Sequence, residues 1–184
     1  MLAFSVNAVT GSFLFAQNAP DYYVINSAFL LKMLLIVVAV ILVIAAIAIP
    51  NLLRSRLAAN ETSAVASLRA INTSQIVYQS SYGPAFATKL ADLSDGGVAA
   101  NCAPLSTPTA TASCLIDASL ASGTKSGYTF TYTPVPTGTL ISSYTVNADP
   151  TSSSASGPRH FFTDQTNVIR VNANATAANT DPPI

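Results

Sequence analysis

Residues 29–56 read FLLKMLLIVVAVILVIAAIAIPNLLRSR, and this stretch limits what fold the rest of the chain can have. From Met33 to Ile49 it holds 17 consecutive apolar residues. As a helix this run is about 25 Å long, and with the leucines on either side it can cross a bilayer. A core helix of a soluble protein would carry a polar stripe, and a cleaved secretory signal would have a shorter apolar region. We therefore expect a membrane-spanning helix.

The composition limits the kind of partner. The chain has 184 residues, of which 50% are hydrophobic and only 9% charged, with eight Lys and Arg against eight Asp and Glu. This length fits one domain with an attached segment. Binding to nucleic acid depends on a basic surface that displaces counterions from phosphates, and a net charge of zero gives no such indication. Nucleic acid is therefore not an expected partner.

The residues after the apolar run predict a second, amphipathic part of the same helix, over 54–83. Its apolar residues recur mostly three, four or seven apart, which places them on one face: Leu53, Leu57, Ala64, Val65, Leu68, Ile71 and Tyr78. The other faces are expected to carry the polar residues Arg54, Arg56, Glu61, Arg69, Asn72 and Gln75. Gly83-Pro84 should end the helix, because proline cannot continue the hydrogen-bond ladder.

Alternating patterns later in the chain predict strands. GYTFTYT places Tyr128, Phe130 and Tyr132 on one face, and LISSYTVNA places Leu140, Tyr144, Val146 and Ala148 inward. RHFFTDQTNVIRVN reads as a hairpin that turns at Asp164 to Asn167. Pro134-Val-Pro136 is expected in a surface connection, and ATAANTDPPI as a loose tail.

These elements predict an α+β fold, in which a long N-terminal helix packs on a small antiparallel sheet of three or four strands. The expected divisions are a leader or pre-segment (1–28), a transmembrane or filament-core helix (29–53), an amphipathic helix (54–83), a helix-to-sheet loop with the cysteine pair (84–125), the antiparallel sheet (126–173) and a flexible tail (174–184).

The two cysteines predict a disulfide. Cys102 and Cys114 enclose a Pro-, Ser- and Thr-rich loop, without a CxxC motif or nearby histidines, so zinc is not expected. In the chain-entropy model, a disulfide here would stabilise the folded state by about 3 kcal/mol, because it restrains the loop in the unfolded chain. It would need an oxidising compartment. The alternative is two reduced, buried thiols, for which the loop offers little cover.

Residues for catalysis or metal binding are sparse. His160 is the only histidine, and no serine stands in a G-x-S-x-G motif, so we expect no enzyme activity and no cofactor. No acidic cluster has the spacing of calcium ligands, and a shared calcium site at Asp149 and Asp164 is a weak candidate that only the family resemblance given below implies. We expect no metal site, and we expect Tyr78, Tyr82 and Phe86 to be packing residues.

The order of Phe29, a Leu-, Ile- and Val-rich run, AAIAIPNLL and an amphipathic stem resembles the N-terminal segment of type IV pilins and type II secretion pseudopilins. The match covers Ala28 to about Gly83. In that family a prepilin peptidase cuts before a phenylalanine, and a proline follows 21 residues later, which is the spacing from Phe29 to Pro50. The resemblance implies processing between Ala28 and Phe29, methylation there, and a kink or local unwinding of the helix at Pro50.

The resemblance implies a structural subunit that waits in the bacterial inner membrane with its C-terminal domain in the periplasm. Its partners would be the prepilin peptidase, the assembly machinery and copies of itself in a helical filament, located in the periplasm or outside the cell. The filament could serve adhesion, motility, DNA uptake or secretion. This chain could be its major or a minor subunit.

Three departures from the family pattern leave a second function open. This chain has Ala28 where the family has glycine, Lys32 where it has an aliphatic residue, and Met33 where it has a glutamate that neutralises a neighbouring subunit's amine. The leader lacks Lys and Arg, and a degenerate or misread start of the gene before Leu34 would explain this together with the three departures. The alternative function is a membrane-tethered periplasmic domain that does not polymerise or joins as a minor subunit.

Overall fold

The structure is a computed structural model that describes residues 10–14, 27–97, 102–103 and 106–184. Most of the expected leader, 1–28, therefore lies outside the described residues, although residues 10–14 are helical. The chain divides into two compact units, Met1–Leu52 and Leu53–Ile184. The second unit is called the head below.

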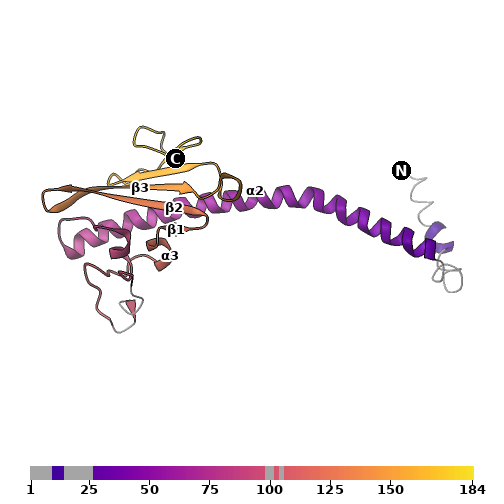
Figure 1. Ribbon diagram of the computed structural model, residues 1–184, viewed down its shortest axis with the longest axis horizontal. Coiled ribbons are helices and arrows are strands. Elements are labelled where there is room, and N and C mark those ends of the chain that lie inside the picture. Colours follow the sequence, from indigo (N-terminus) through magenta and orange to yellow (C-terminus); the bar gives the residue numbers. More distant parts are fainter. Residues whose placement is uncertain (1–9, 15–26, 98–101, 104–105) are drawn as a thin grey trace. The chain divides into compact units, whose positions relative to one another are not determined.

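Helix α2 runs from Ser27 to Tyr82 (Figure 1), and it confirms the helix expected from the apolar run and the amphipathic stem. It contains Pro50, and the helix is assigned on both sides of this residue. The kink expected at Pro50 stays a prediction. The helix ends where Gly83 takes a φ of +118°, a backbone conformation that side-chain-bearing residues rarely adopt. The Gly83-Pro84 stop is thus confirmed.

The head contains one antiparallel sheet with the strand order β1-β2-β3-β4-β5, so neighbours in the sheet are also neighbours along the chain. Its strands are β1 (Thr124–Lys125), β2 (Tyr128–Thr137), β3 (Leu140–Pro150), β4 (His160–Asp164) and β5 (Arg170–Asn172). Short helical segments connect them to α2 and to one another: η2 (Leu90–Leu93), α3 (Ala118–Ala121) and α4 (Ser153–Ser156). The α+β class is confirmed. The sheet has five strands where three or four were expected, because the two-residue β1 extends its edge.

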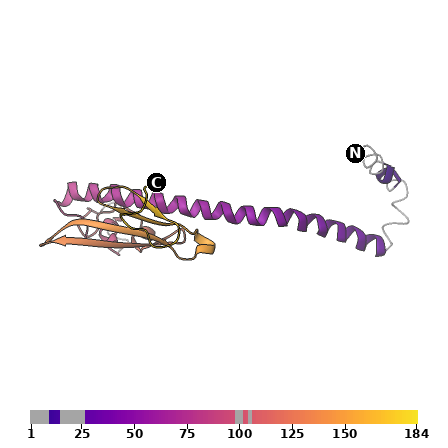
Figure 2. The ribbon, with the colours of Figure 1, turned by 90° about the horizontal axis from the view of Figure 1, so that it is seen from above.

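The core lies where the sheet runs along the second half of α2 (Figure 2). The aromatic faces of β2 and β3 meet the helix there, with Phe130 and Tyr144 buried. The helix contributes Leu68 and Ile71, both fully buried, as the stripe predicted. Leu140 was expected inward but is 48% exposed, because it is the first residue of β3.

The segment Pro134-Val-Pro136 was expected to be a surface connection, but it lies inside β2. The N–H of Phe130 points away from β3 and donates to the carbonyl of Gly123 at 2.7 Å. Pro134 is an even number of residues after Phe130, so its backbone nitrogen faces the same side of β2. β1 does not extend that far, so no strand there needs an N–H from Pro134. Proline is tolerated at such an edge, and the register also shifts between Val135 and Pro136.

The C-terminal segment, expected to be a loose tail, is hydrogen-bonded to the sheet in several places. The N–H of Val171 donates to the carbonyl of Pro182, and the N–H of Ile184 donates to the carbonyl of Ile169. Asn147 of β3 reaches the carbonyl of the buried Ala177 at 2.7 Å. These bonds satisfy backbone groups at the β5 edge that would otherwise be left open.

Candidate functional site

The first candidate site is the apolar segment of α2 between Leu30 and Ile49. Its large apolar side chains are 42% to 71% exposed. Among the described residues, α2 is the one helix that is long and apolar enough to cross a membrane, and none of its most apolar stretch is buried. Because exposed apolar surface of this extent is costly in water, the segment needs lipid or other protein to cover it.

The predicted processing residues lie at the start of this helix. Ala28 and Phe29 are its second and third residues, after Ser27. Lys32 and Met33 follow in the next turn, and Met33 is 44% exposed. The helix therefore begins close to the expected cleavage position, but cleavage itself stays a prediction.

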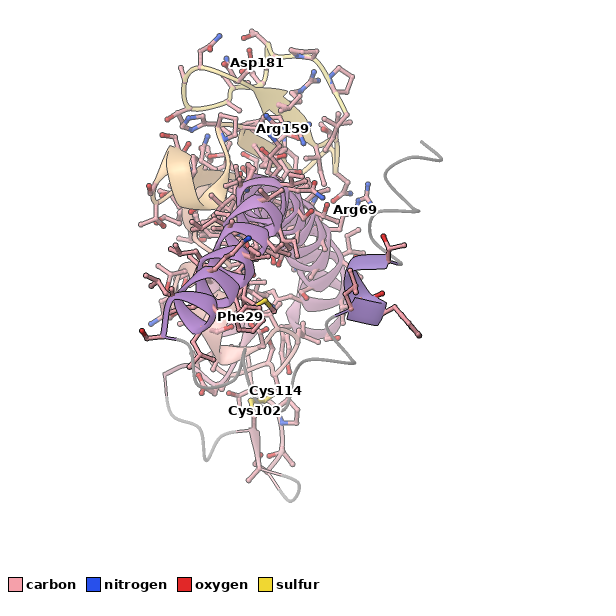
Figure 3. All side chains as sticks on the ribbon, turned by 90° about the vertical axis from the view of Figure 1, so that its right-hand side faces the viewer. Phe29, Arg69, Cys102, Cys114, Arg159 and Asp181 are labelled. Carbon is pink, nitrogen blue, oxygen red and sulfur yellow. A yellow bond between two sulfur atoms is a disulfide. The ribbon has the colours of Figure 1, made fainter. Side chains whose placement is uncertain are left out.

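Cys102 and Cys114 form a disulfide, as expected from the sequence. Figure 3 shows it as a yellow bond between the two labelled residues. The chain after Cys114 is anchored to η2, since the N–H of Leu115 donates to the carbonyl of Leu93 at 2.7 Å. The hydroxyl of Tyr78 donates to the carbonyl of Ala110 inside the loop at 2.9 Å, which ties this loop to α2.

Three polar residues of α2 that were expected on faces other than the apolar stripe are buried in the head. Glu61 is only 7% exposed, and its carboxylate accepts hydrogen bonds from the guanidinium of Arg159, whose Nε lies 2.9 Å away. This hydrogen bonding raises the pKa of Arg159, because it favours the charged form. The pair joins α2 to the chain that enters β4.

Asn72 is the second such residue and lies between the helix and the sheet. Its Nδ2 donates to the hydroxyl of Thr163 at 2.8 Å, and its Oδ1 accepts from the hydroxyl of Tyr144 at 3.1 Å. Burial raises the pKa of Tyr144. All three side chains are buried, so the network satisfies polar groups that have no access to water.

Gln75 is the third, and it is fully buried. Its Nε2 donates to the hydroxyl of Tyr132 at 3.0 Å, while its Oε1 accepts from the N–H of Ala87 at 3.0 Å. The hydroxyl of Tyr132 in turn donates to the carbonyl of Ala87 at 2.6 Å. Burial is the main cause that raises the pKa of Tyr132. This closed set of bonds fixes the chain that leaves the end of α2.

The structure brings His160 and Asp149 together, with Nδ1 and Oδ1 2.6 Å apart. Asp149 and Asp164, the weak calcium candidate, are not brought together, because Asp164 pairs with Thr145 in the sheet register. No group of three or more His, Cys, Asp and Glu residues within the described ranges could hold a metal ion.

The sequence held a signal for the buried polar residues. Gln75 is four residues after Ile71 and three before Tyr78, and Asn72 is four after Leu68. This spacing places them on or beside the apolar stripe. Their polarity led to the prediction that they lie on other faces of the helix, whereas their spacing from Leu68 and Ile71 indicates the core face.

Comparisons with protein-family models, with curated proteins and with solved structures find no match for this chain.

Proposed function

We propose that this chain is a structural subunit of a bacterial type IV pilus or type II secretion pseudopilus. The apolar segment of α2 holds it in the inner membrane, and the same segment packs against other copies in a helical filament. The observation that carries the proposal is the long helix whose apolar half is exposed and whose other half is part of a folded head. The disulfide between Cys102 and Cys114 suits a head in the periplasm.

In this proposal the environment of the apolar segment changes when the filament assembles. Lipid covers it before assembly, and neighbouring helices cover it in the filament, so its exposed side chains are buried in both states. The head supplies the outer surface of the filament. No catalytic role is proposed.

The mature N-terminus tests the proposal directly. The full chain is co-expressed with a prepilin peptidase and a pilus assembly machinery, and sheared surface filaments and membranes are analysed by intact-mass measurement. We expect cleavage before Phe29, methylation of that residue and recovery of the chain in filaments. Ala28→Val is the matched variant, and it should block cleavage by placing a bulkier side chain at the cleavage position. Chain that stays uncut in the membrane, and is unaffected by loss of the assembly machinery, contradicts the proposal.

The departures at Lys32 and Met33 favour a second candidate, a membrane-tethered domain that does not polymerise or joins filaments as a minor subunit. A lysine within an apolar filament core would repel other amines, whereas a single anchored copy can extend the lysine to the lipid headgroups. The two candidates differ in stoichiometry. Filaments made of this chain alone support the first, and filaments that hold only traces of it support the second.

A further inference from the structure

Two arginines follow the apolar segment directly. Arg54 comes immediately after Leu52 and Leu53, and Arg56 is two residues further on. All four side chains are exposed. Neither arginine forms an ion pair with any residue that the structure describes. The nearest acidic residue after them along the chain is Glu61, whose carboxylate is buried and already bound by Arg159.

Most other cations of the head are engaged. Lys89, Lys125 and Arg159 each have a carboxylate partner, and Arg170 donates to the carbonyl of Asp181 at 2.8 Å. Among the described residues of the head, Arg69 is the other arginine that, like Arg54 and Arg56, is exposed and forms no ion pair, and it lies further along α2. Positive charge without a partner is therefore concentrated where the apolar segment ends.

We propose that Arg54 and Arg56 bind the phosphate groups of anionic phospholipids where α2 leaves the bilayer. This inference rests on the proposed membrane anchoring. A guanidinium presents a planar set of donors that matches two phosphate oxygens, and it is less strongly hydrated than an ammonium. The exposed Leu52 and Leu53 place these donors at the level where acyl chains give way to headgroups. The partner is an anionic lipid surface.

Spin-labelled lipids test the inference on the full chain reconstituted in vesicles of phosphatidylcholine and phosphatidylglycerol. Electron paramagnetic resonance gives the association of labelled phosphatidylglycerol relative to labelled phosphatidylcholine at the protein surface. We expect a preference for phosphatidylglycerol of about fivefold per arginine, weakened by salt. Arg54→Gln/Arg56→Gln should abolish this preference, and Arg69→Gln is the matched control that should retain it.

Each outcome has a defined meaning. If the wild-type chain shows no preference, or if Arg69→Gln removes it as fully as the double variant, the inference is wrong. A preference that is lost only in the double variant supports it. Extraction of the vesicles with alkaline carbonate tests membrane anchoring separately from the arginine contacts. Chain that is washed off contradicts membrane anchoring, whereas chain that is retained without a lipid preference contradicts the arginine contacts alone.

Discussion

Glu61 of α2 and Arg159, one residue before β4, form a partly buried ion pair in which the arginine Nε lies 2.9 Å from the carboxylate. The two residues are far apart in the sequence, so the pair fixes how the sheet is placed on the helix. The glutamate side chain is only 9% exposed and the arginine side chain 50%. The carboxylate thus depends on its partner more than the guanidinium does.

Arg159→Met should therefore destabilise the head by about 2 kcal/mol, which is less than the loss expected for a fully buried pair, because one partner is half exposed. Urea denaturation of the full chain in detergent, followed by circular dichroism, measures this loss. Arg69→Met on the exposed side of α2 is the control and should change the free energy of unfolding by about 0.5 kcal/mol or less. Equal losses in the two variants would show that the pair contributes nothing specific.

Gln75→Leu should destabilise the head by about 2 kcal/mol, although it places an apolar side chain in an apolar region. The N–H of Ala87 and the hydroxyl of Tyr132 would each lose a partner without gaining access to water. The same denaturation experiment measures the change. Thr73→Val, an exposed change two residues earlier on α2, is the comparison and should have a small effect. A neutral Gln75→Leu would mean that Ala87 finds another acceptor.

Alkaline stability should depend on Tyr132. An unfolded tyrosine loses its proton near pH 10, while burial raises the pKa of Tyr132 in the folded state above that value. Above about pH 10 the unfolded state therefore releases a proton that the folded state retains, so this contribution to stability is present below pH 10 and falls as the pH rises. In Tyr132→Phe the loss of stability between pH 9 and 11 should be less steep, by up to about 1.4 kcal/mol per pH unit. Urea midpoints across this range measure both slopes, and parallel slopes would contradict the assignment.

The sequence predicted those helices and strands that have one buried face, because their apolar residues recur with the period of the helix or strand. The alternation of Tyr128, Phe130 and Tyr132 identified β2, and the helical spacing of Leu68 and Ile71 identified the buried face of α2. Both signals arise because one side of each element meets the core and the other does not. The end of α2 was also predictable, since Gly83-Pro84 is a local property of the backbone.

The sequence did not predict structural features that depend on contacts between segments far apart in the chain. Glu61 and Gln75 are buried because partners come from far along the chain, from Arg159 just before β4 and from Tyr132 in β2. Pro134 sits inside a strand because β1 is too short to cover that edge. The loose-tail prediction did not anticipate the bonds from Val171 and Ile184, because backbone pairing leaves no trace in side-chain polarity.

Replacing both cysteines should lower the stability of the head by about 3 kcal/mol, in line with the loop that they close. Cys102→Ser/Cys114→Ser is compared with the wild type by urea denaturation, with and without reductant. Reductant should destabilise the wild type toward the double variant and leave the double variant unchanged. Thiol alkylation in intact cells, followed by recovery of the chain from membranes, should modify neither cysteine, and full alkylation would contradict an oxidising location for the head.

Met33→Glu should increase the amount of chain recovered in filaments, if the chain assembles as proposed. After cleavage, Phe29 would carry a free amine within an apolar core, where an unpaired charge is costly. A glutamate four residues later could neutralise the amine of a neighbouring copy, whereas the exposed Met33 can only add apolar contact. Met33→Gln is the matched control, because it has similar size and polarity but no charge, and it should leave recovery unchanged. Quantitative immunoblots of sheared filaments and of membranes give the ratio. A rise in filament recovery for both variants would assign the effect to polarity, and no rise in either would favour the tethered, non-polymerising domain.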